Sequence, residues 1–347
     1  MTVGPTSPQA GSGLPGGGVP VAVLSRILGS DPAAMAALAA AGLDVVLDLD
    51  GYDALRAGPD DPAGWYQVLG RVHGLVVGLH PLAAEQFGRA PWLRYVLRIG
   101  TGLDNIDVAA ARGHGVRVDS LPGLNAPAVA EYAFALLLAA ARRVTEADRS
   151  LRAGEWTRFT GKHLGGRTLG LIGYGEIARL MVPKARGFGM DVIAHRRHPQ
   201  PDTDGVPQVG LDQLLRTADF ISVHVPLTPA TRGLLGPREF GLMRDGVVLV
   251  NTARGAVVDE PALYQALLAG RVAACGLDVF EREPPGDAPL LALPNVVASP
   301  HNGGYSDLVV GVVAAAAARH LIDGLGLGRG RRGSARDGPA VPSSVHS

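Results

Sequence analysis

Three side chains in the second half of the chain could together carry out an acid–base reaction on a small organic acid: Arg254, Glu283 and His301. The guanidinium of Arg254 can grip a carboxylate through two parallel hydrogen bonds and polarise a neighbouring carbonyl. Imidazole titrates near neutral pH, so His301 suits the exchange of a proton with the substrate oxygen. Glu283, if it hydrogen-bonds the imidazole, would favour its protonated form and fix its orientation. Such a set suits hydride transfer between a hydroxy acid and a nicotinamide, with a protonated histidine for carbonyl reduction and a neutral one for alcohol oxidation.

Each of the three residues also has an ordinary explanation, as a surface ion-pair partner, a turn residue or a partner for backbone groups. Their shared placement favours the functional interpretation. Each follows one of a series of short apolar stretches that are typical of buried strands, at 220–225, 247–251, 274–279 and 296–299. In an open parallel sheet, ligands bind beyond the carboxyl ends of the strands. We therefore expect the chemistry in the loops that follow these stretches.

A second constellation, at residues 169–197, predicts a dinucleotide-binding unit. An apolar stretch enters a Gly-Tyr-Gly turn, a helix-compatible stretch follows, and a second apolar stretch ends the unit. Gly173 would allow the tight turn, and Gly175 would let the backbone approach a pyrophosphate. The third glycine position of this motif is Ala178, which is small enough for close packing. A helix beginning near Glu176 would direct its free N–H groups and its dipole at the phosphates.

The residues that end this unit, His195, Arg196 and Arg197, bear on which cofactor binds. An NAD site normally carries Asp or Glu here, which binds both ribose hydroxyls and repels a 2′-phosphate. Two guanidinium groups can instead clamp a phosphate, so the sequence favours NADP over NAD. A solvated basic loop is the alternative, because exposed arginine pairs are common.

Composition limits the class of protein. The 347 residues suggest two domains, and 47% hydrophobic against 18% charged residues allow sizeable cores. A formal net charge of zero gives no reason to expect nucleic acid or an anionic membrane as partner, and no apolar run is long enough to span a bilayer. The single cysteine, Cys275, lies in an apolar stretch where a small buried hydrophobe is expected, which fits a reducing cytoplasm. We expect no metal site.

Both ends of the chain differ in composition from the rest. Residues 1–18 are rich in Gly, Pro and Ser and lack the basic start and apolar core of a signal peptide. Residues 326–347 are rich in Gly, Arg and Ser and show no apolar periodicity. Both segments are expected to be disordered tails.

Between the tails, apolar stretches alternate with helix-compatible stretches, which predicts an α/β fold with mostly parallel, helix-covered sheets. An Ala-rich helix should begin at Asp31-Pro32, a suitable N-cap and first-turn pair. The longest helical stretch, 125–143, is apolar nearly all round, so it must be buried on several sides, as at a domain or subunit junction. The strands expected in the first part of the chain are 20–24, 45–49, 74–77, 95–99 and 116–119.

Over about residues 20–325, the chain resembles the D-isomer-specific 2-hydroxyacid dehydrogenases. The resemblance rests on several collinear motifs, which together are far more specific than any one of them: GTGLDNIDVAAARGHGVRV, NAPAVAEYAFALLLA, LGLIGYGEIA, HVPLTPATRGLL, VLVNTARGAVVDEPAL, GLDVFEREPP and SPHNGG.

That resemblance implies an architecture of two Rossmann-like, doubly wound domains. A dinucleotide-binding domain at 126–304 would be inserted between two parts of a substrate domain at 19–125 and 305–325, with a helix at 306–321 returning the chain. Catalysis would take place in a cleft that a hinge closes. The family is usually dimeric, and the apolar helix from Asn125 onward would contribute to that contact.

The resemblance also implies a role for each site residue. It assigns Arg254 to substrate binding, Glu283 to the partner of the acid–base group, and His301 to the proton donor. The positions that would contact the cofactor are Gly173, Tyr174, Gly175, Glu176, Ile177, His195, Arg196, Arg197, Val225, Pro226, Thr231, Thr252, Ala253, Asp278, Gly303 and Gly304. Those that would contact the substrate are Val77, Gly78, Leu79, Gly102, Arg254 and His301.

One departure from the family pattern bears on the substrate. Phosphoglycerate dehydrogenases would typically show Arg and Ser where Val77 and Gly78 stand. Without that arginine a phosphorylated substrate loses a charge partner, and a phosphate left unpaired in a closing cleft is costly. Backbone N–H groups around Gly78 and Leu79 could still hold a carboxylate. The sequence therefore favours a small unphosphorylated 2-oxo acid such as glyoxylate or hydroxypyruvate, with D-3-phosphoglycerate or phosphite oxidation as alternatives.

A protein of another class is a further alternative. Some relatives serve as dinucleotide-sensing transcriptional corepressors, and these retain a similar trio of residues. A complete acid–base set would be idle in a pure sensor, which favours an enzyme.

Overall fold

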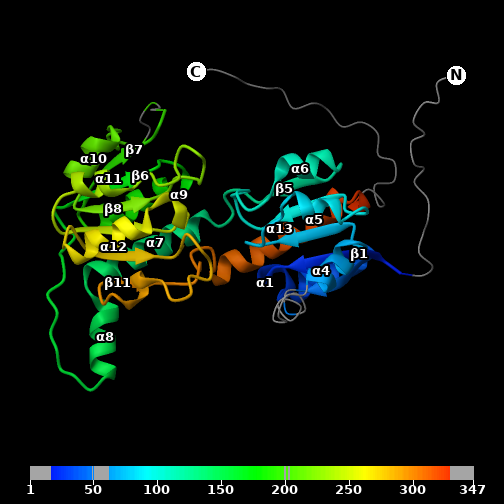
Figure 1. Ribbon diagram of the computed structural model, residues 1–347, viewed down its shortest axis with the longest axis horizontal. Helices are drawn as coiled ribbons and strands as arrows, with labels where there is room; N and C mark the ends of the chain where they lie inside the picture. Colours follow the sequence, from blue (N-terminus) through cyan, green and yellow to red (C-terminus); the bar gives the residue numbers. More distant parts are fainter. Residues whose placement is uncertain (1–16, 49, 51–61, 199–200, 202–203, 329–347) are drawn as a thin grey trace. The chain divides into compact units, whose positions relative to one another are not determined.

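The structure is a computed structural model that describes residues 17–48, 50, 62–198, 201 and 204–328 (Figure 1). Most of both predicted tails lies outside these residues. The chain forms two compact units, each described here by itself. Unit 1 comprises the chain up to Ile99, Asn105–Asp119 and the chain from Ala314 onward, and unit 2 comprises Gly100–Asp104 and Ser120–Val313. The domain limits expected from the sequence stay a prediction.

Unit 1 is built on a sheet with the strand order β2-β1-β3-β4-β5. The pairs β1–β2, β1–β3 and β3–β4 are parallel. The strands are β1 (Val19–Leu24), β2 (Leu43–Asp48), β3 (Gly74–Val77), β4 (Tyr95–Arg98) and β5 (Arg117–Ser120). The helices are α1 (Arg26–Gly29), α2 (Pro32–Ala40), α4 (Pro62–Leu69), α5 (Ala84–Gly88), α6 (Val108–Gly113) and α13 (Asp307–Gly324), which passes from unit 2 into unit 1 at Ala314.

An N-cap fixes the start of α2, and close packing at two glycines fixes the end of α13. The carboxylate of Asp31 accepts a hydrogen bond of 2.8 Å from the backbone N–H of Ala34, which confirms the predicted N-cap of α2. The last turn of α13 packs on the sheet through two glycines. A Cβ on Gly324 would overlap the ring of Tyr95, and a Cβ on Gly74 would lie 2.9 Å from the side chain of Leu325.

Unit 2 is built on a sheet with the strand order β11-β10-β9-β8-β6-β7, in which every neighbouring pair is parallel. The strands are β6 (Thr168–Ile172), β7 (Asp191–His195), β8 (Phe220–Val223), β9 (Val247–Asn251), β10 (Val272–Leu277) and β11 (Val296–Ala298). The helices are α7 (Ala126–Ala141), α8 (Val144–Arg152), α9 (Glu176–Gly187), α10 (Leu211–Thr217), α11 (Pro237–Leu242) and α12 (Glu260–Leu268), with 3-10 turns η1 (Gly255–Val257) and η2 (Pro289–Ala292).

The two faces of this sheet pack into separate hydrophobic clusters. Along β9, Val248 and Val250 join the cluster that contains α7 and α9, while Val247 and Leu249 join the cluster that contains α10, α11 and α12. This alternation follows from the two-residue period of a strand. The sheet is therefore parallel and covered by helices on both faces, which confirms the predicted doubly wound α/β fold.

Helix α7 is the apolar helix expected at 125–143, and the structure buries ten of its residues. It packs on α9 and on strands β9 and β10, so the prediction of burial on several sides is confirmed.

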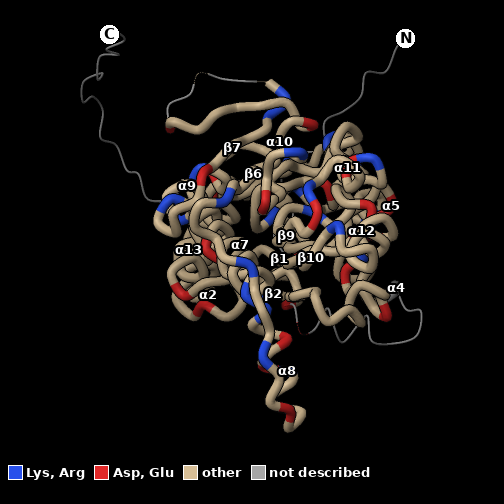
Figure 2. The backbone as a smooth tube through the Cα atoms, turned by 90° about the vertical axis from the view of Figure 1, so that its left-hand side faces the viewer, with Lys and Arg blue, Asp and Glu red and all other residues tan. Residues whose placement is uncertain are grey.

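The helix that follows, α8, projects from the rest of unit 2 with charges of both signs along it (Figures 1 and 2). Two apolar side chains of α8 are exposed, Val144 (54%) and Leu151 (59%), and so is Trp156 (82%) in the segment that follows the helix. The described residues include no helix that is long and apolar enough to cross a membrane.

Cys275 lies on β10, between β9 and β11, with none of its surface exposed. Burial raises the pKa of its thiol, because the thiolate would lose its hydration.

The native protein should therefore react with a thiol reagent such as DTNB only as fast as it unfolds. Denaturant should expose one reactive thiol per chain. Cys275→Ser, which buries a hydroxyl, should lower the free energy of unfolding by about 1–3 kcal/mol. Rapid modification of the native protein would contradict this burial.

Candidate active site

The turn between β6 and α9 has the geometry of a phosphate-binding turn. Gly173 has a φ of +91°, and a Cβ there would lie 2.6 Å from the carbonyl oxygen of His224. Gly175 caps α9, and among the described residues nothing lies within 4 Å of the place where its Cβ would be. Ala178 is fully buried behind the turn. The start of the helix at Glu176 is confirmed, and its free N–H groups are placed at the carboxyl end of β6.

Two buried polar atoms at the same edge of the sheet have no hydrogen-bond partner among the described residues. They are Nε2 of His224, just after β8, and Oγ1 of Thr252, just after β9. Burial lowers the pKa of His224 to about 4, so its ring is neutral at physiological pH. Buried polar atoms are nearly always paired in folded proteins. The edge is therefore fitted to receive a polar ligand, and its position beside the β6–β8 switch point suits a dinucleotide.

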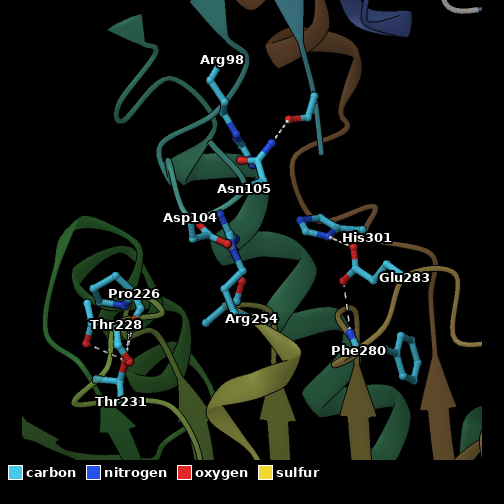
Figure 3. A network of polar contacts seen from close by, with 12 residues as sticks. Arg98, Asp104, Asn105, Pro226, Thr228, Thr231, Arg254, Phe280, Glu283 and His301 are labelled. Carbon is cyan, nitrogen blue, oxygen red and sulfur yellow. Dashed lines mark hydrogen bonds and ion pairs between the residues drawn. The ribbon is translucent and has the colours of Figure 1, made fainter. Parts of the chain in front are cut away.

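The sequence places His224, Val225 and Pro226 together at the end of an apolar stretch, but only Val225 and Pro226 were assigned to the cofactor. In the next turn, the hydroxyl of Thr231 donates a 2.6 Å hydrogen bond to the carbonyl of Pro226 and accepts one of 2.8 Å from the N–H of Thr228 (Figure 3). Thr231 thus closes the turn that presents Val225 and Pro226.

At the end of β7 the predicted cofactor residues lie in different environments. Nδ1 of His195 lies 3.0 Å from the carbonyl oxygen of Val209, so this ring holds the loop in place. Arg196 is half-buried and Arg197 is exposed. Tyr174 is buried, and its hydroxyl donates a 3.0 Å hydrogen bond to Asp204. Tyr174 can therefore offer a cofactor its backbone rather than its ring.

The three chemistry-bearing residues follow three neighbouring strands: Arg254 comes after β9, Glu283 after β10 and His301 after β11. Nδ1 of His301 lies 2.8 Å from Oε2 of Glu283, while Oε1 of the same carboxylate accepts a 3.1 Å hydrogen bond from the N–H of Phe280 (Figure 3). This arrangement orients the imidazole and leaves its Nε2 for proton exchange.

A single carboxylate holds the loop that carries His301. Asp278, which is 1% exposed, accepts a 2.6 Å hydrogen bond from the hydroxyl of Ser299 and two of 2.7 Å from the N–H groups of Asn302 and Gly303. Burial raises the pKa of Asp278, and these hydrogen bonds oppose the rise. His301 itself has a φ of +56°, a left-handed conformation that the surrounding hydrogen bonds maintain.

Glycines bring the site loops close together. A Cβ on Gly303 would lie 2.9 Å from Oδ2 of Asp278, and one on Gly304 would lie 3.1 Å from Nδ2 of Asn125. A Cβ on Gly255 would overlap the backbone of Phe280 and Glu281. The turn that carries Arg254 therefore lies directly against the loop that carries Glu283.

The side chain of Asn251 braces the Arg254 turn. Nδ2 of Asn251 donates a 2.9 Å hydrogen bond to the carbonyl of Arg254, and Oδ1 of Asn251 accepts one of 3.0 Å from the N–H of Ala253. The guanidinium of Arg254 is paired with Asp104, which sequence analysis did not single out. Asp104 precedes Arg254 by 150 residues, so no local pattern could have linked the two.

The predicted substrate residues are divided between the units. Val77, Gly78 and Leu79 lie in unit 1, where the side chain of Val77 is fully buried and Leu79 is exposed. Nδ2 of Asn105 donates hydrogen bonds to the carbonyls of Gly78 (3.2 Å) and His80 (2.8 Å) and so anchors this loop. Gly102 lies in unit 2, against the guanidinium of Arg254. Within the described part of the chain, no cluster of three or more His, Cys, Asp or Glu side chains could hold a metal ion.

Comparison with known proteins agrees with this geometry. The family profile for the D-isomer specific 2-hydroxyacid dehydrogenase NAD binding domain matches residues 134–303. A hydroxypyruvate reductase of Thermotoga maritima is 49% identical over 217 residues, which are 61% of this chain and 71% of the relative. A glyoxylate reductase of Korarchaeum cryptofilum is 44% identical over 252 residues, 70% of this chain and 76% of the relative.

Two further similar proteins are a dehydrogenase and a solved structure. A D-3-phosphoglycerate dehydrogenase of Methanocaldococcus jannaschii is 44% identical over 225 residues, 63% of this chain but 43% of the relative. The crystal structure of a Thermus thermophilus protein superimposes with a TM-score of 0.78 at 36% identity, covering 88% of this chain and 97% of that one. From the profile, the relatives and the shared fold, we conclude that this chain belongs to the D-isomer specific 2-hydroxyacid dehydrogenase family.

Proposed function

We propose that this nicotinamide-dependent oxidoreductase reduces a small unphosphorylated 2-oxo acid, of the glyoxylate or hydroxypyruvate type, to the 2-hydroxy acid, which is the D isomer where the product is chiral. The observation that carries the proposal is the Glu283–His301 pair, 2.8 Å between Oε2 and Nδ1, at the same sheet edge as Arg254. The names of the relatives from Thermotoga maritima and Korarchaeum cryptofilum agree with this substrate class.

Each residue then has one task. Arg254 binds the substrate carboxylate and draws electron density from the neighbouring carbonyl. His301 donates the proton on Nε2 to the carbonyl oxygen as that oxygen becomes a hydroxyl. Glu283 keeps the imidazole in one orientation and favours its charged form. The bound reduced nicotinamide would supply the hydride, with Gly173, Gly175 and the polar atoms after β8 and β9 lining its site.

The preference for an unphosphorylated acid rests on the loop after β3. Val77 and Gly78 provide no cation there, so a phosphate would have no charge partner from these two positions. The backbone N–H groups of Gly78 and Leu79 suit a smaller carboxylate. Oxidation of D-3-phosphoglycerate is the second candidate, because a phosphoglycerate dehydrogenase is also among the relatives.

We further propose that the cofactor is NADP, because Arg196 and Arg197 follow β7 where an NAD enzyme would carry a carboxylate.

We propose a homodimer that covers the apolar side chains of α8 and the segment after it, since Leu151 and Trp156 are exposed in the single chain. A cytoplasmic location agrees with a lone, buried cysteine.

Replacing either member of the acid–base pair should lower the catalytic efficiency. His301→Gln should lower kcat/KM for glyoxylate or hydroxypyruvate reduction by about 10²–10⁴-fold, because the proton donor is lost. Glu283→Gln should lower it by about 10–100-fold, since the charged hydrogen bond becomes a neutral one. The measurement is cofactor oxidation across glyoxylate, hydroxypyruvate, pyruvate and 3-phosphohydroxypyruvate. His320→Gln, at an exposed position of α13, is the matched control. A wild-type preference for 3-phosphohydroxypyruvate would overturn the proposed substrate.

Neutralising the two arginines after β7 should change the cofactor preference. Arg196→Ala with Arg197→Ala should lower kcat/KM for NADPH by about 10–100-fold, because charge-assisted hydrogen bonds to the 2′-phosphate are lost. Activity with NADH should change little. Initial rates with both cofactors measure the ratio, and Arg216→Ala on α10 is the control. Equal losses with both cofactors, or a wild-type preference for NADH, would remove the basis of the NADP proposal.

An acidic residue on α8 should separate the proposed dimer. Leu151→Asp places a charge on an apolar contact and should halve the mass measured by sedimentation, while the circular dichroism spectrum stays native. Leu268→Asp changes a leucine of similar exposure on α12 (57%) and should leave the mass unchanged. A wild-type protein that sediments as a monomer would refute the dimer.

A further inference from the structure

Asp104 reaches the active site from a distant part of the sequence. It lies in the segment Gly100–Asp104, which follows β4 in the sequence but belongs to unit 2. Both oxygens of its carboxylate accept a hydrogen bond from Nε of Arg254, at 3.1 and 3.0 Å (Figure 3). The side chains of Arg254 and Asp104 are 21% and 27% exposed, so the pair is shielded from most of the solvent. A shielded, charge-assisted pair fixes geometry better than an exposed one.

This contact decides which edge of the guanidinium remains available. An arginine can bind a carboxylate through Nε and one Nη, or through its two Nη atoms. Asp104 occupies Nε, and Nη1 donates a 2.8 Å hydrogen bond to the carbonyl of Ala253. Among the described residues, no hydrogen bond engages Nη2. The N–H groups left for a ligand are therefore those on the outer edge, between Nη1 and Nη2.

Gly102 holds the guanidinium from a third side. A Cβ at this position would overlap Nη2 of Arg254 and would lie 2.5 Å from Oδ1 of Asp104. The segment thus contributes both a charge partner and a surface without a side chain. Together they confine Arg254 to one orientation, which a flexible four-bond side chain would not keep by itself.

We propose that Asp104 is a positioning residue for the reaction, which fixes Arg254 so that its outer edge binds the carboxylate of the substrate. The inference rests on the proposed function, in which Arg254 is the group that holds that carboxylate. Asp104 does not touch the substrate. It acts through Arg254, and it lowers the cost of ordering the guanidinium when the substrate binds.

The experiment compares Asp104→Ala and Asp104→Asn with the wild-type protein and with Asp245→Ala as a control. Asp245 pairs with Arg271 at 2.5 Å but its side chain is 86% exposed, so its removal should change little. Two quantities are measured in the full chain: steady-state KM for the 2-oxo acid, and the affinity for oxalate, an unreactive dicarboxylate, by calorimetry in the presence of the cofactor. Cofactor affinity and melting temperature are recorded for each variant.

Asp104→Ala should raise KM and weaken oxalate binding by about tenfold or more, because the charged carboxylate that accepts from Nε no longer orients Arg254. Asp104→Asn keeps an oxygen acceptor and should change both by only about threefold. Cofactor affinity should stay within twofold. In an Arg254→Lys background, which has no Nε, adding Asp104→Ala should have little further effect on oxalate affinity.

Three outcomes would overturn the inference. Unchanged oxalate affinity in Asp104→Ala would show that Arg254 needs no partner. Tighter binding would show that Asp104 competes with the ligand for the guanidinium. An equal loss of cofactor affinity and oxalate affinity would show a general structural role. If oxalate binding depends on Asp104 and Arg254 as expected but no 2-oxo acid is reduced, the proposed function fails and the positioning role stands.

Discussion

The chemistry of this protein depends on the ends of parallel strands meeting at one edge of a sheet. In unit 2, the glycine turn follows β6, and the three chemistry-bearing side chains follow β9, β10 and β11, which are neighbours in the sheet. Backbone groups in the middle of a parallel sheet are paired with neighbouring strands and are not available for binding. The loops at the edge are therefore free to supply catalytic groups, and the sheet holds them at fixed separations.

Much of this arrangement could be predicted from the sequence, because its signals are local. The strands at Gly74–Val77 and Val247–Asn251 have the predicted limits, since each is a continuous apolar run bounded by polar or turn residues. Others differ at their ends. The predicted strand at 220–225 ends at Val223, because Pro226 and the turn closed by Thr231 take the chain out of the sheet.

The rest could not be predicted, because it depends on contacts between residues far apart in the chain. The carboxylate of Asp278, for example, accepts three hydrogen bonds from the loop that carries His301, more than 20 residues further along the chain. Spacing alone cannot show that a buried polar atom such as Nε2 of His224 has no hydrogen-bond partner among the residues that the structure describes. The pairing of Arg254 with Asp104 likewise depends on the fold, which brings the segment at 100–104 beside Arg254.

That segment has a consequence for how the protein can be divided. Residues 100–104 are separated from the main run of unit 2 by Asn105–Asp119, which belong to unit 1. A fragment cut to begin at Ser120 would keep the glycine turn, Glu283 and His301, but its Arg254 would lose the carboxylate that it faces. The cofactor-binding half is therefore not a module that can be excised or exchanged as one continuous piece of sequence, and chimeras between relatives must carry this five-residue segment along with it.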